Sequence, residues 1–444
     1  MENLRQSKGY RTRVLIGSLV GGTLEYYDYE LYGILASLVF GQLFFPSFNP
    51  VIGRLLAFAS FGLTFFLRPV GGIVFSHLGD KIGRKNTLVM TITIMGISSL
   101  CIGLLPTYQT IGVWAPILLV FLRLVQGFAL GGEWGGSMLL SIENSEKKKR
   151  GFYGSVPMMG AAIGLLLGLI IVSIMQALMA HQFLVWGWRI PFIISFVLTI
   201  FGLWVRNGLE ETMEFQETKK KGHTVKIPIA NVVRYQWKSV LMAIGIKIIE
   251  AAPYYIFATF AVSYASNYLH MKEGPVLNSV TVGTLFSVIA IPIFGILCNK
   301  VGPKVLFVIG SILTILFAYP YFYIMGTRTV LGVAVATIIG MVLWAMITSV
   351  LGTLLTDLFH TNVRYTGISV GYQIGTALAG GTAPMIATAL IEAFHGSWVP
   401  VAWYIIIVAA ISLLSILIIH LTQSKGTKQA YEPDETTTKT PLEH

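Results

Sequence analysis

Charged residues and cysteine are scarce in this chain of 444 residues. Only 11% of its residues are Asp, Glu, Lys or Arg, whereas 55% are hydrophobic and the mean hydropathy is +0.73. Soluble domains carry about 25% charged residues, so this composition excludes an ordinary soluble protein and predicts a membrane protein with many crossings. The two cysteines, Cys101 and Cys298, lie in or at the ends of apolar stretches in opposite halves, and they indicate neither a disulfide framework nor a metal site.

Sequence motifs of catalysis are also missing. The chain contains no nucleophile elbow, no cluster of metal ligands and no phosphate-binding loop. A cleavable signal peptide is not expected, because the first apolar run is too long and carries acidic residues. The sequence therefore predicts neither an enzyme nor a metal or cofactor site, and it predicts that the chain inserts through its own helices.

Long apolar runs are what the sequence does contain. About twelve of them are near or above the roughly 20 residues that a helix needs to cross a bilayer. We therefore expect an all-α membrane protein with twelve transmembrane helices in two pseudo-symmetric six-helix bundles. The expected divisions are a first bundle at 1–208, a cytoplasmic loop at 209–238, a second bundle at 239–422 and a cytoplasmic tail at 423–444, whose final "LEH" resembles a cloning scar.

The distribution of Lys and Arg predicts the orientation of these helices. With the amino terminus inside, 24 of the 31 Lys and Arg residues fall on the cytoplasmic side, three on the opposite side and four within spans. Cytoplasmic loops are enriched in these residues, so both termini are predicted to be cytoplasmic. The net charge of +11 then reports topology and does not predict a nucleic-acid partner.

An internal repeat supports the division into two halves. The stretch "HLGDKIGRK" at 77–85 aligns with "ILCNKVGPK" at 296–304, an offset of 219 positions. Two further inner loops each place an acidic residue seven positions before a basic one, namely Glu143 before Arg150 and Asp357 before Arg364. Duplicated halves are typical of secondary transporters, whose sites lie near the bilayer midplane between the repeats.

Several motifs give the chain a family resemblance. The glycine-rich helix end and the loop after it, "GGIVFSHLGDKIGRK" at 71–85, resemble a motif of the major facilitator superfamily. The chain is most similar to the metabolite:proton symporter branch, which holds shikimate, ketoglutarate, citrate and proline/betaine carriers. This similarity rests on "LEYYDYELYG" at 24–33, "RLVQGFALGGEWGG" at 123–136, "GWRIPF" at 187–192 and "RYTGISVGYQIGTALAGGTAP" at 364–384. The resemblance covers nearly the whole chain and implies a multi-pass carrier of a bacterial cell membrane.

The inner loops supply candidate gating residues. Asp80 can pair with Arg84 and with the positive amino-terminal end of a neighbouring helix, and the family resemblance implies that this motif braces one of two alternating conformations. The alternative is that the basic residues of the loop only enforce orientation. In the second copy Asn299 and Pro303 replace the acid and the arginine, so an ionic latch is not expected there. The candidate gating residues are Asp80, Arg84, Lys85, Glu143, Arg150, Asp357 and Arg364.

The first helix carries acidic residues where lipid would make them unfavourable. Glu25, Asp28, Tyr29 and Tyr32 recur at helical spacing and share one face, which we expect to line a cavity. Asp28 is near the centre of its span, where an ionisable residue costs about 2.5 to 3.5 kcal/mol and therefore needs a partner or a proton. Glu30 lies off this face, and the sequence assigns it no role.

The fourth expected helix, at about 112–140, offers the partner for Asp28. Arg123 and Gln126 lie near its middle, and Glu133 lies about two turns nearer the cytoplasm. We expect an anionic substrate that engages Arg123 to take the counter-charge from Asp28, which would link substrate occupancy to proton occupancy. The alternative is a static ion pair that joins helices one and four. The candidate proton-coupling residues are Asp28, Glu25 and Glu133.

The second half supplies a corresponding wall. The offset of 219 carries Asp28 onto Lys247, and Glu250 is three residues further along the same helix, close enough to neutralise it. A purely structural pair is the alternative. Pro253 is expected to loosen the helix beside Tyr254. With three residues added by analogy, the candidate substrate-binding residues are Arg123, Gln126, Tyr29, Tyr32, Lys247, Glu250, Tyr254, Trp344, Tyr372 and Gln373.

The sequence thus predicts a proton-driven symporter that imports a small carboxylate-bearing metabolite by alternating access. The near balance of charge favours a monocarboxylate or a zwitterion over a tricarboxylate, and the short tail without heptads argues against an osmosensing betaine carrier. Each proton supplies roughly 1.4 kcal/mol per pH unit and about 2.3 kcal/mol per 100 mV. The expected partners are the substrate, protons and the lipid bilayer, and a monomer is expected. The alternative is a proton-driven efflux antiporter for drugs or amphiphiles on the same fold.

Overall fold

The computed structural model is built from helices. It describes residues 8–82, 84–131, 138, 141–142, 145, 147–179, 182–207, 236–359 and 364–424. Throughout these residues the regular structure is helical, as apolar runs in a bilayer require, because a helix satisfies its own backbone hydrogen bonds.

The first half of the chain forms six long helices with short connecting elements. In chain order they are α2 (Lys8–Leu35), which continues through a π-helical turn (Ala36–Phe40) into α3 (Gly41–Phe44), then α4 (Pro50–Ile82), α5 (Arg84–Leu104), the short α6 (Tyr108–Ile111), α7 (Trp114–Leu130), α9 (Arg150–Met179) and α10 (Ile190–Asn207). Single 3₁₀ turns, Lys147–Lys149 and Gly187–Arg189, precede the last two long helices.

The second half repeats the pattern. Its helices are α13 (Trp237–Tyr255), which continues through a π-helical turn (Ile256–Phe260) into α14 (Ala261–Asn267), then α15 (Glu273–Val301), α16 (Pro303–Met325), α17 (Val330–Leu358), α18 (Arg364–Gly375), which continues through a π-helical turn (Thr376–Gly380) towards α19 (Ala383–Ala393), and α20 (Val399–Ser424). The π-helical turns at 36–40 and 256–260 are 220 positions apart, close to the offset of the loop repeat, so the two halves share this irregularity.

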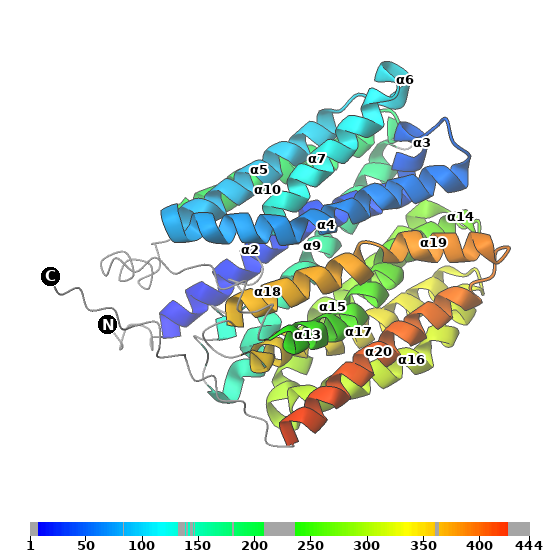
Figure 1. Cartoon of the computed structure of the whole chain (residues 1–444). Helices are drawn as coiled ribbons and strands as arrows, with labels where there is room; N and C mark the ends of the chain where they lie inside the picture. The colour runs from blue at the N-terminus through cyan, green and yellow to red at the C-terminus, as the bar shows by residue number, and fades with distance from the viewer. Residues whose placement is uncertain are drawn as a thin grey trace.

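These helices make the twelve predicted membrane crossings. Within the described residues, nine segments are long and apolar enough to span a membrane, α5 and α7 are shorter apolar helices, and α2 is the helix that carries the acidic residues. The start of α2 and the end of α20 lie at the same end of the bundle (Figure 1). The predicted all-α fold is therefore confirmed, and the start of α2 and the end of α20 share one side of the bundle.

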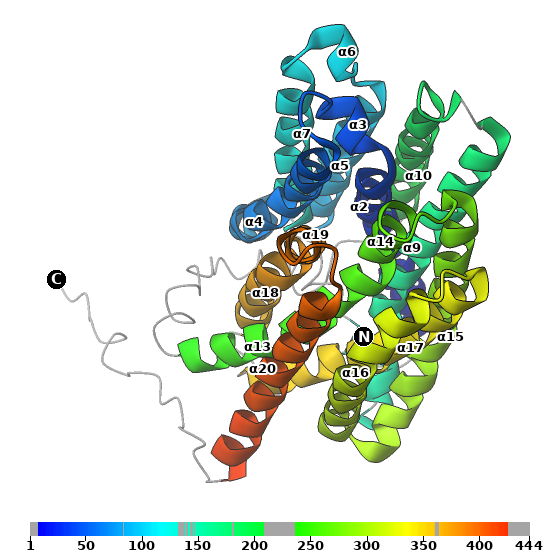
Figure 2. The same cartoon turned by 90° about the vertical axis from the view of Figure 1, so that its right-hand side faces the viewer.

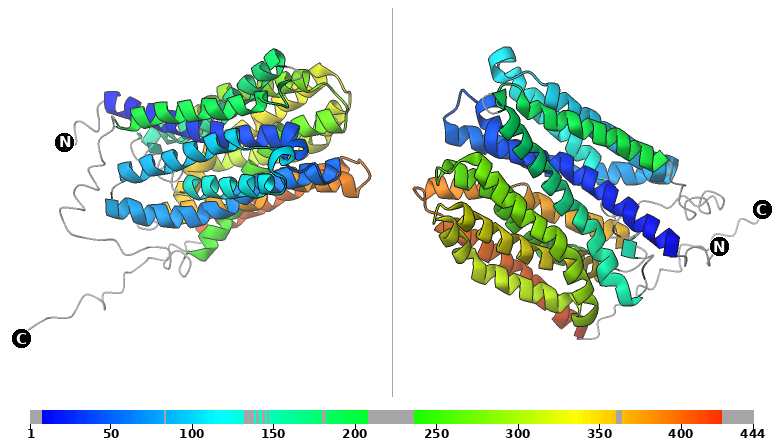
Figure 3. Two further views of the ribbon diagram at one scale, coloured as in Figure 1. Left: turned by 90° about the horizontal axis from the view of Figure 1, so that it is seen from above. Right: turned by 180° about the vertical axis from the view of Figure 1, so that it is seen from behind.

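The helices of each half gather on their own side of the molecule. The first half, coloured blue to cyan-green, lies apart from the second half, coloured green to red (Figures 1 and 2). The view from behind shows the same separation (Figure 3). The halves meet where α9 packs against α15 and α17, and where α4 packs against α18 and α19. Any group on these helices that faces inward is thus enclosed by both halves.

Glycines of α9 and α18 recur every four residues, at 160, 164 and 168 and at 367, 371 and 375, and allow neighbouring helices to approach closely. A Cβ atom at Gly164 would lie 2.5 Å from the backbone nitrogen of Tyr27 in α2, and one at Gly375 would lie 2.7 Å from the Cβ of Lys247 in α13. Side chains at these positions would push the helices apart, so the glycines set the spacing of the helices that carry the central polar residues.

Candidate functional site

Asp28 of α2 lies at the centre of a buried hydrogen-bond network. Its side chain is 2% exposed and accepts hydrogen bonds from the Ser99 hydroxyl of α5, from the Ser195 hydroxyl of α10 at 2.8 Å and from the Gln126 amide of α7 at 3.3 Å. Gln126 also donates to the Ser99 oxygen at 2.5 Å. Three helices of the first half therefore supply donors to one carboxylate, which stabilises its ionised form in a dry interior.

Arg123 of α7 is fully buried and only partly satisfied. Its Nη1 donates to Gln126 Oε1 at 2.7 Å, whereas its Nε and Nη2 find no hydrogen-bond partner in the described part of the chain. The expectation that Arg123 pairs with Asp28 is wrong in this structure, because no ion pair between described residues joins them. Gln126 is one helical turn from Arg123 and has both an acceptor and a donor, so its amide bridges the two charged groups.

Aromatic rings of α2 and α4 surround the buried arginines. The guanidinium carbon of Arg123 lies 3.9 Å from the centroid of the Tyr32 ring, and that of Arg68 lies 4.6 Å from the centroids of Tyr29 and Phe65. Aromatic faces stabilise weakly hydrated guanidinium groups. The predicted stripe of α2 thus faces the interior, and its rings hold two arginines in place without using their N–H groups.

The other two candidate proton-coupling residues are placed differently. Glu25 is buried, with 6% of its surface exposed, and its charge acts on Arg68. Glu133 lies outside the described residues. The central network therefore consists of Asp28, Gln126 and Arg123, with Glu25 and Arg68 towards the cytoplasmic end of the same interior.

Lys247 and Glu250 of α13 form the predicted ion pair. The Glu250 carboxylate also accepts a hydrogen bond from the Thr348 hydroxyl at 3.0 Å, and its backbone oxygen accepts one from the Trp344 indole at 3.0 Å. The Tyr254 ring lies 4.5 Å from the Trp344 ring, centroid to centroid. Residues proposed separately from the sequence therefore form one buried cluster between α13 and α17.

Two residues of α18 complete this wall. Lys247 Nζ lies 3.9 Å from the centroid of the Tyr372 ring, and the Tyr372 hydroxyl shares a hydrogen bond of 3.0 Å with the Tyr26 hydroxyl of α2. Gln373 is buried, and among the described residues its Oε1 has no hydrogen-bond partner. The two halves thus meet through polar side chains at the level of the central network.

On the cytoplasmic side, two contacts join the halves. Arg150 Nη1 at the start of α9 lies 3.7 Å from Asp357 Oδ1 near the end of α17, and the backbone N–H of Gly151 donates to Asn299 Oδ1 of α15 at 2.9 Å. The sequence grouped Glu143 with Arg150 in the first half and Asp357 with Arg364 in the second half. In the structure Arg150 of the first half instead contacts Asp357 of the second half. The remaining gating candidates cannot be placed in contacts: Glu143 lies outside the described residues, as do the side chains of Asp80, Arg84, Lys85 and Arg364.

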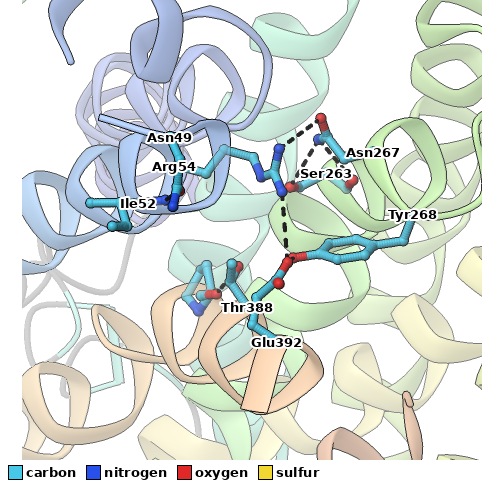
Figure 4. Close-up of polar contacts among 9 residues, drawn as sticks. Asn49, Ile52, Arg54, Ser263, Asn267, Tyr268, Thr388 and Glu392 are labelled. Carbon is cyan, nitrogen blue, oxygen red and sulfur yellow. Dashed lines mark hydrogen bonds and ion pairs between the residues drawn. The ribbon is translucent and has the colours of Figure 1, made fainter. Parts of the chain in front are cut away.

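On the opposite side a second cluster, drawn in Figure 4, also joins the halves. Arg54 of α4 lies 3.9 Å from Glu392 of α19 through Nη2 and donates from Nη1 to Asn267 at 3.4 Å. The Tyr268 hydroxyl donates to the same Glu392 oxygen at 2.8 Å. Burial and this hydrogen bond raise the pKa of Tyr268 to about 12, so its hydroxyl remains a donor at physiological pH. We call Arg54, Asn267, Tyr268 and Glu392 the outer cluster.

The central residues are closed off from both faces in this structure. Asp28 and Lys247 are 2% exposed and Arg123 is 0% exposed, while the Arg150–Asp357 contact and the outer cluster are both formed. Sequence reasoning missed the outer cluster. The one signal for it was that Arg54 is among only three basic residues assigned to the outer side.

Comparisons with known proteins agree with this arrangement. Residues 19–380 match the model of the family described as Major Facilitator Superfamily. The chain is 39% identical over 416 residues to the shikimate transporter of Escherichia coli strain K12, covering 93% of this chain and 95% of that one. It is 34% identical over 435 residues to the glycine betaine/proline/ectoine/pipecolic acid transporter OusA of Dickeya dadantii strain 3937, covering 95% and 86%.

Solved structures share the fold. A partially occluded, inward-open structure of the xylose transporter XylE from E. coli superposes with a TM-score of 0.71 at 14% identity, covering 93% of this chain and 98% of that one. A structure of the proton:xylose symporter XylE bound to 6-bromo-6-deoxy-D-glucose gives a TM-score of 0.72 at 15% identity, covering 93% and 96%. At this identity the match supports the fold alone.

Proposed function

The chain belongs to the Major Facilitator Superfamily, and from this premise we propose that it is a proton-coupled symporter that imports a small carboxylate-bearing metabolite by alternating access. It is a multi-pass transporter of the inner membrane and not an enzyme, like its relatives. The substrate class, the proton coupling and the roles of individual residues are the parts that we propose.

The observation that carries this proposal is the state of Arg123. Its guanidinium is buried, stacked on Tyr32, and leaves Nε and Nη2 unused among the described residues. An unsatisfied buried donor is unfavourable by about 1 to 3 kcal/mol, and more when the group is charged. A substrate carboxylate would satisfy both N–H groups at once in the fork geometry that arginine favours. Arg123 is therefore the proposed anchor for the substrate carboxylate.

Gln126 provides the proposed link between substrate and proton. It contacts Arg123 through its amide oxygen and Asp28 through its amide nitrogen. A substrate carboxylate on Arg123 adds a negative charge near Asp28, and a proton on Asp28 offsets that charge. Substrate and proton are thus expected to bind together and to leave together.

The relatives support the substrate class. Shikimate carries one carboxylate, and glycine betaine, proline, ectoine and pipecolic acid are zwitterions with one carboxylate each; these compounds are named for two relatives of this chain. A single carboxylate is what their substrates have in common. A monocarboxylate or a zwitterion also suits a site whose second-half cation, Lys247, is already paired with Glu250.

Two sets of contacts between the halves support the proposal of alternating access. We propose that 1–208 and 239–422 rock about the central network, so that the outer cluster breaks to admit substrate and the Arg150–Asp357 contact breaks to release it. The π-helical turns near the outer ends of α2 and α13 are places where such helices adjust. The outer cluster then stabilises the closed outer side, and the Arg150–Asp357 contact stabilises the closed cytoplasmic side.

Arg54→Gln is expected to favour opening of the outer side. The change removes the ion pair to Glu392, and with partly buried partners this contact and its hydrogen bonds are worth about 1 kcal/mol or slightly more. Amide hydrogen exchange near Asn267 and at the end of α19 should accelerate by roughly threefold to tenfold.

The matched variant Arg150→Gln should accelerate exchange at the start of α9 and the end of α17 instead. Arg328→Gln, a change at an exposed outer arginine, should do neither. Equal exchange in all three variants would contradict alternating use of the two contacts.

The Lys247–Glu250 pair offers a test of its role. Glu250→Gln is expected to destabilise the protein by about 3 to 5 kcal/mol, because a buried lysine loses its partner. Lys247→Met combined with Glu250→Gln should regain most of this stability in a thermal unfolding assay. If the pair contacts substrate, as proposed, the double variant stays inactive in substrate exchange. Recovery of transport together with stability would make the pair purely structural.

A binding assay tests the substrate class. The purified carrier in detergent is heated with shikimate, glycine betaine or proline, with analogues that lack the carboxylate, and with amphiphilic cations. We expect stabilisation by at least one carboxylate compound, none by its analogue, and loss of the effect in Arg123→Lys. Stabilisation by amphiphilic cations alone would favour the efflux antiporter instead.

A further inference from the structure

Glu30 of α2 is a buried carboxyl group to which the proposed mechanism gives no role. It is 0% exposed, and within the described chain neither of its carboxyl oxygens has a hydrogen-bond partner. Asp28, two residues earlier, accepts hydrogen bonds from three side chains. Two acids on one helix at similar depth therefore have opposite environments, one built to hold a negative charge and one not.

The groups that face Glu30 come from both halves of the carrier. Tyr254 and Tyr255 of α13 direct their hydroxyl groups at its carboxyl group, although among the described residues no hydrogen bond of standard geometry forms to Glu30 or to the Tyr254 hydroxyl. Arg68 of α4 and Arg123 of α7 act on Glu30 more weakly. On α2 itself Glu25, Asp28 and Tyr29 are the neighbouring titratable groups. Glu30 thus lies where α2 of the first half faces α13 of the second half.

The balance of buried charges shows what this site lacks. The buried ionisable side chains that the structure describes are four acids, Glu25, Asp28, Glu30 and Glu250, and three bases, Arg68, Arg123 and Lys247. After Lys247 and Glu250 neutralise each other, three acids face two arginines. A bound monocarboxylate adds a further negative charge to this interior, and protons on the buried acids offset it.

The three hydrogen bonds to Asp28 and their absence at Glu30 determine which acid takes a proton first. An isolated carboxylate in a dry interior is so unfavourable that the group takes up a proton instead. A protonated carboxyl at Glu30 would also become a donor, able to bond the tyrosine hydroxyls of α13. The same site then joins the two halves when protonated and loses this donor when ionised.

We propose that Glu30 is a second proton-binding site, located between α2 and α13, and that the closed carrier holds a proton there. Taken with the proposed symport, on which this part rests, the carrier moves two protons with each substrate, one on Asp28 and one on Glu30. The proton on Glu30 is released when the halves separate and water reaches the carboxyl group.

Infrared difference spectroscopy tests the proton on Glu30 without any substrate. The carrier in liposomes is titrated across neutral pH, in H₂O and in D₂O, and the C=O band of protonated carboxyl groups is followed. Wild type should show a band that Glu30→Gln removes and that Glu273→Gln, a change at an exposed acid, leaves intact. An unchanged band in Glu30→Gln would overturn the proposal. Glutamine resembles the neutral acid, and Glu30→Met provides a second variant if the first does not fold.

Proton stoichiometry tests the second half of the inference, with shikimate, glycine betaine and proline as probes. At zero membrane potential and a gradient of one pH unit, two protons balance about a 100-fold substrate gradient and one proton about a tenfold gradient. Net proton flux should reach zero at a 100-fold substrate gradient in wild type and at a tenfold gradient in Glu30→Gln. Equal null points in both proteins would overturn the two-proton assignment. If no probe moves protons in wild type, the symport proposal fails, whereas the infrared result still decides whether Glu30 binds a proton.

Discussion

Arg123→Lys is expected to weaken substrate binding and substrate-driven proton influx by about tenfold or more. Lysine keeps the positive charge but lacks the planar fork, so the two charge-assisted hydrogen bonds proposed for the carboxylate cannot form together, and each is worth about 1.5 kcal/mol or more. Initial rates in liposomes and equilibrium binding of a labelled carboxylate probe measure the effect. The loss should appear in the affinity, because the proton site at Asp28 is retained.

The control for this variant is Arg328→Lys, which makes the same chemical change at an exposed outer position. It should leave binding and transport unchanged. Thermal unfolding of Arg123→Lys without substrate checks that the helix packing survives, since the stacking on Tyr32 is available to either cation. An affinity equal to wild type in a folded Arg123→Lys protein would show that Arg123 does not hold the carboxylate.

Asp28→Asn is expected to lower accumulation against a gradient to the level that one proton supports, while leaving exchange of substrate intact. The asparagine oxygen still accepts a hydrogen bond from one of the two serine hydroxyls, and its NH2 group can donate to the other hydroxyl, so the network keeps its shape. The side chain no longer binds and releases a proton. In liposomes with an inward gradient of one pH unit and no membrane potential, the ratio of internal to external substrate should fall from about 100 to about 10, the value that the proton on Glu30 alone supports. Labelled substrate should still exchange with unlabelled substrate.

Ser195→Ala is the matched variant, because it removes one hydrogen bond from Asp28 and keeps the carboxylate. It should still accumulate substrate, and the pH optimum of transport should differ from that of wild type. Accumulation by Asp28→Asn at the wild-type level would remove Asp28 from the coupling mechanism, and loss of both accumulation and exchange would make its role structural.

Sequence patterns predicted the fold because membrane helices follow simple constraints. Apolar length sets the number of crossings, and this number agrees with the helices observed. Lys and Arg predict which side the termini take. The depth of Asp28 and Arg123 in their spans also predicted their burial, since a charged residue avoids lipid at that depth.

The details of the site depended on features that spacing does not contain. The bridge through Gln126 depends on side-chain rotamers of α7. Glu30 was set aside because it lies off the stripe, yet α2 packs against α4, α5, α9 and α10, so more than one of its faces is interior. The outer cluster joins three stretches that are far apart in the chain and share no local motif, namely Arg54, Asn267 with Tyr268, and Glu392.

The direction of proton movement tests the central claim most directly. Purified wild-type protein is placed in liposomes with a pH dye inside and exposed in turn to shikimate, glycine betaine, proline and other organic acids and amino acids. Symport predicts that at least one carboxylate compound acidifies the interior, at a rate that rises with its concentration. Failure of every such compound, together with proton movement in the exchange direction driven by amphiphilic cations, would contradict import and establish efflux in its place.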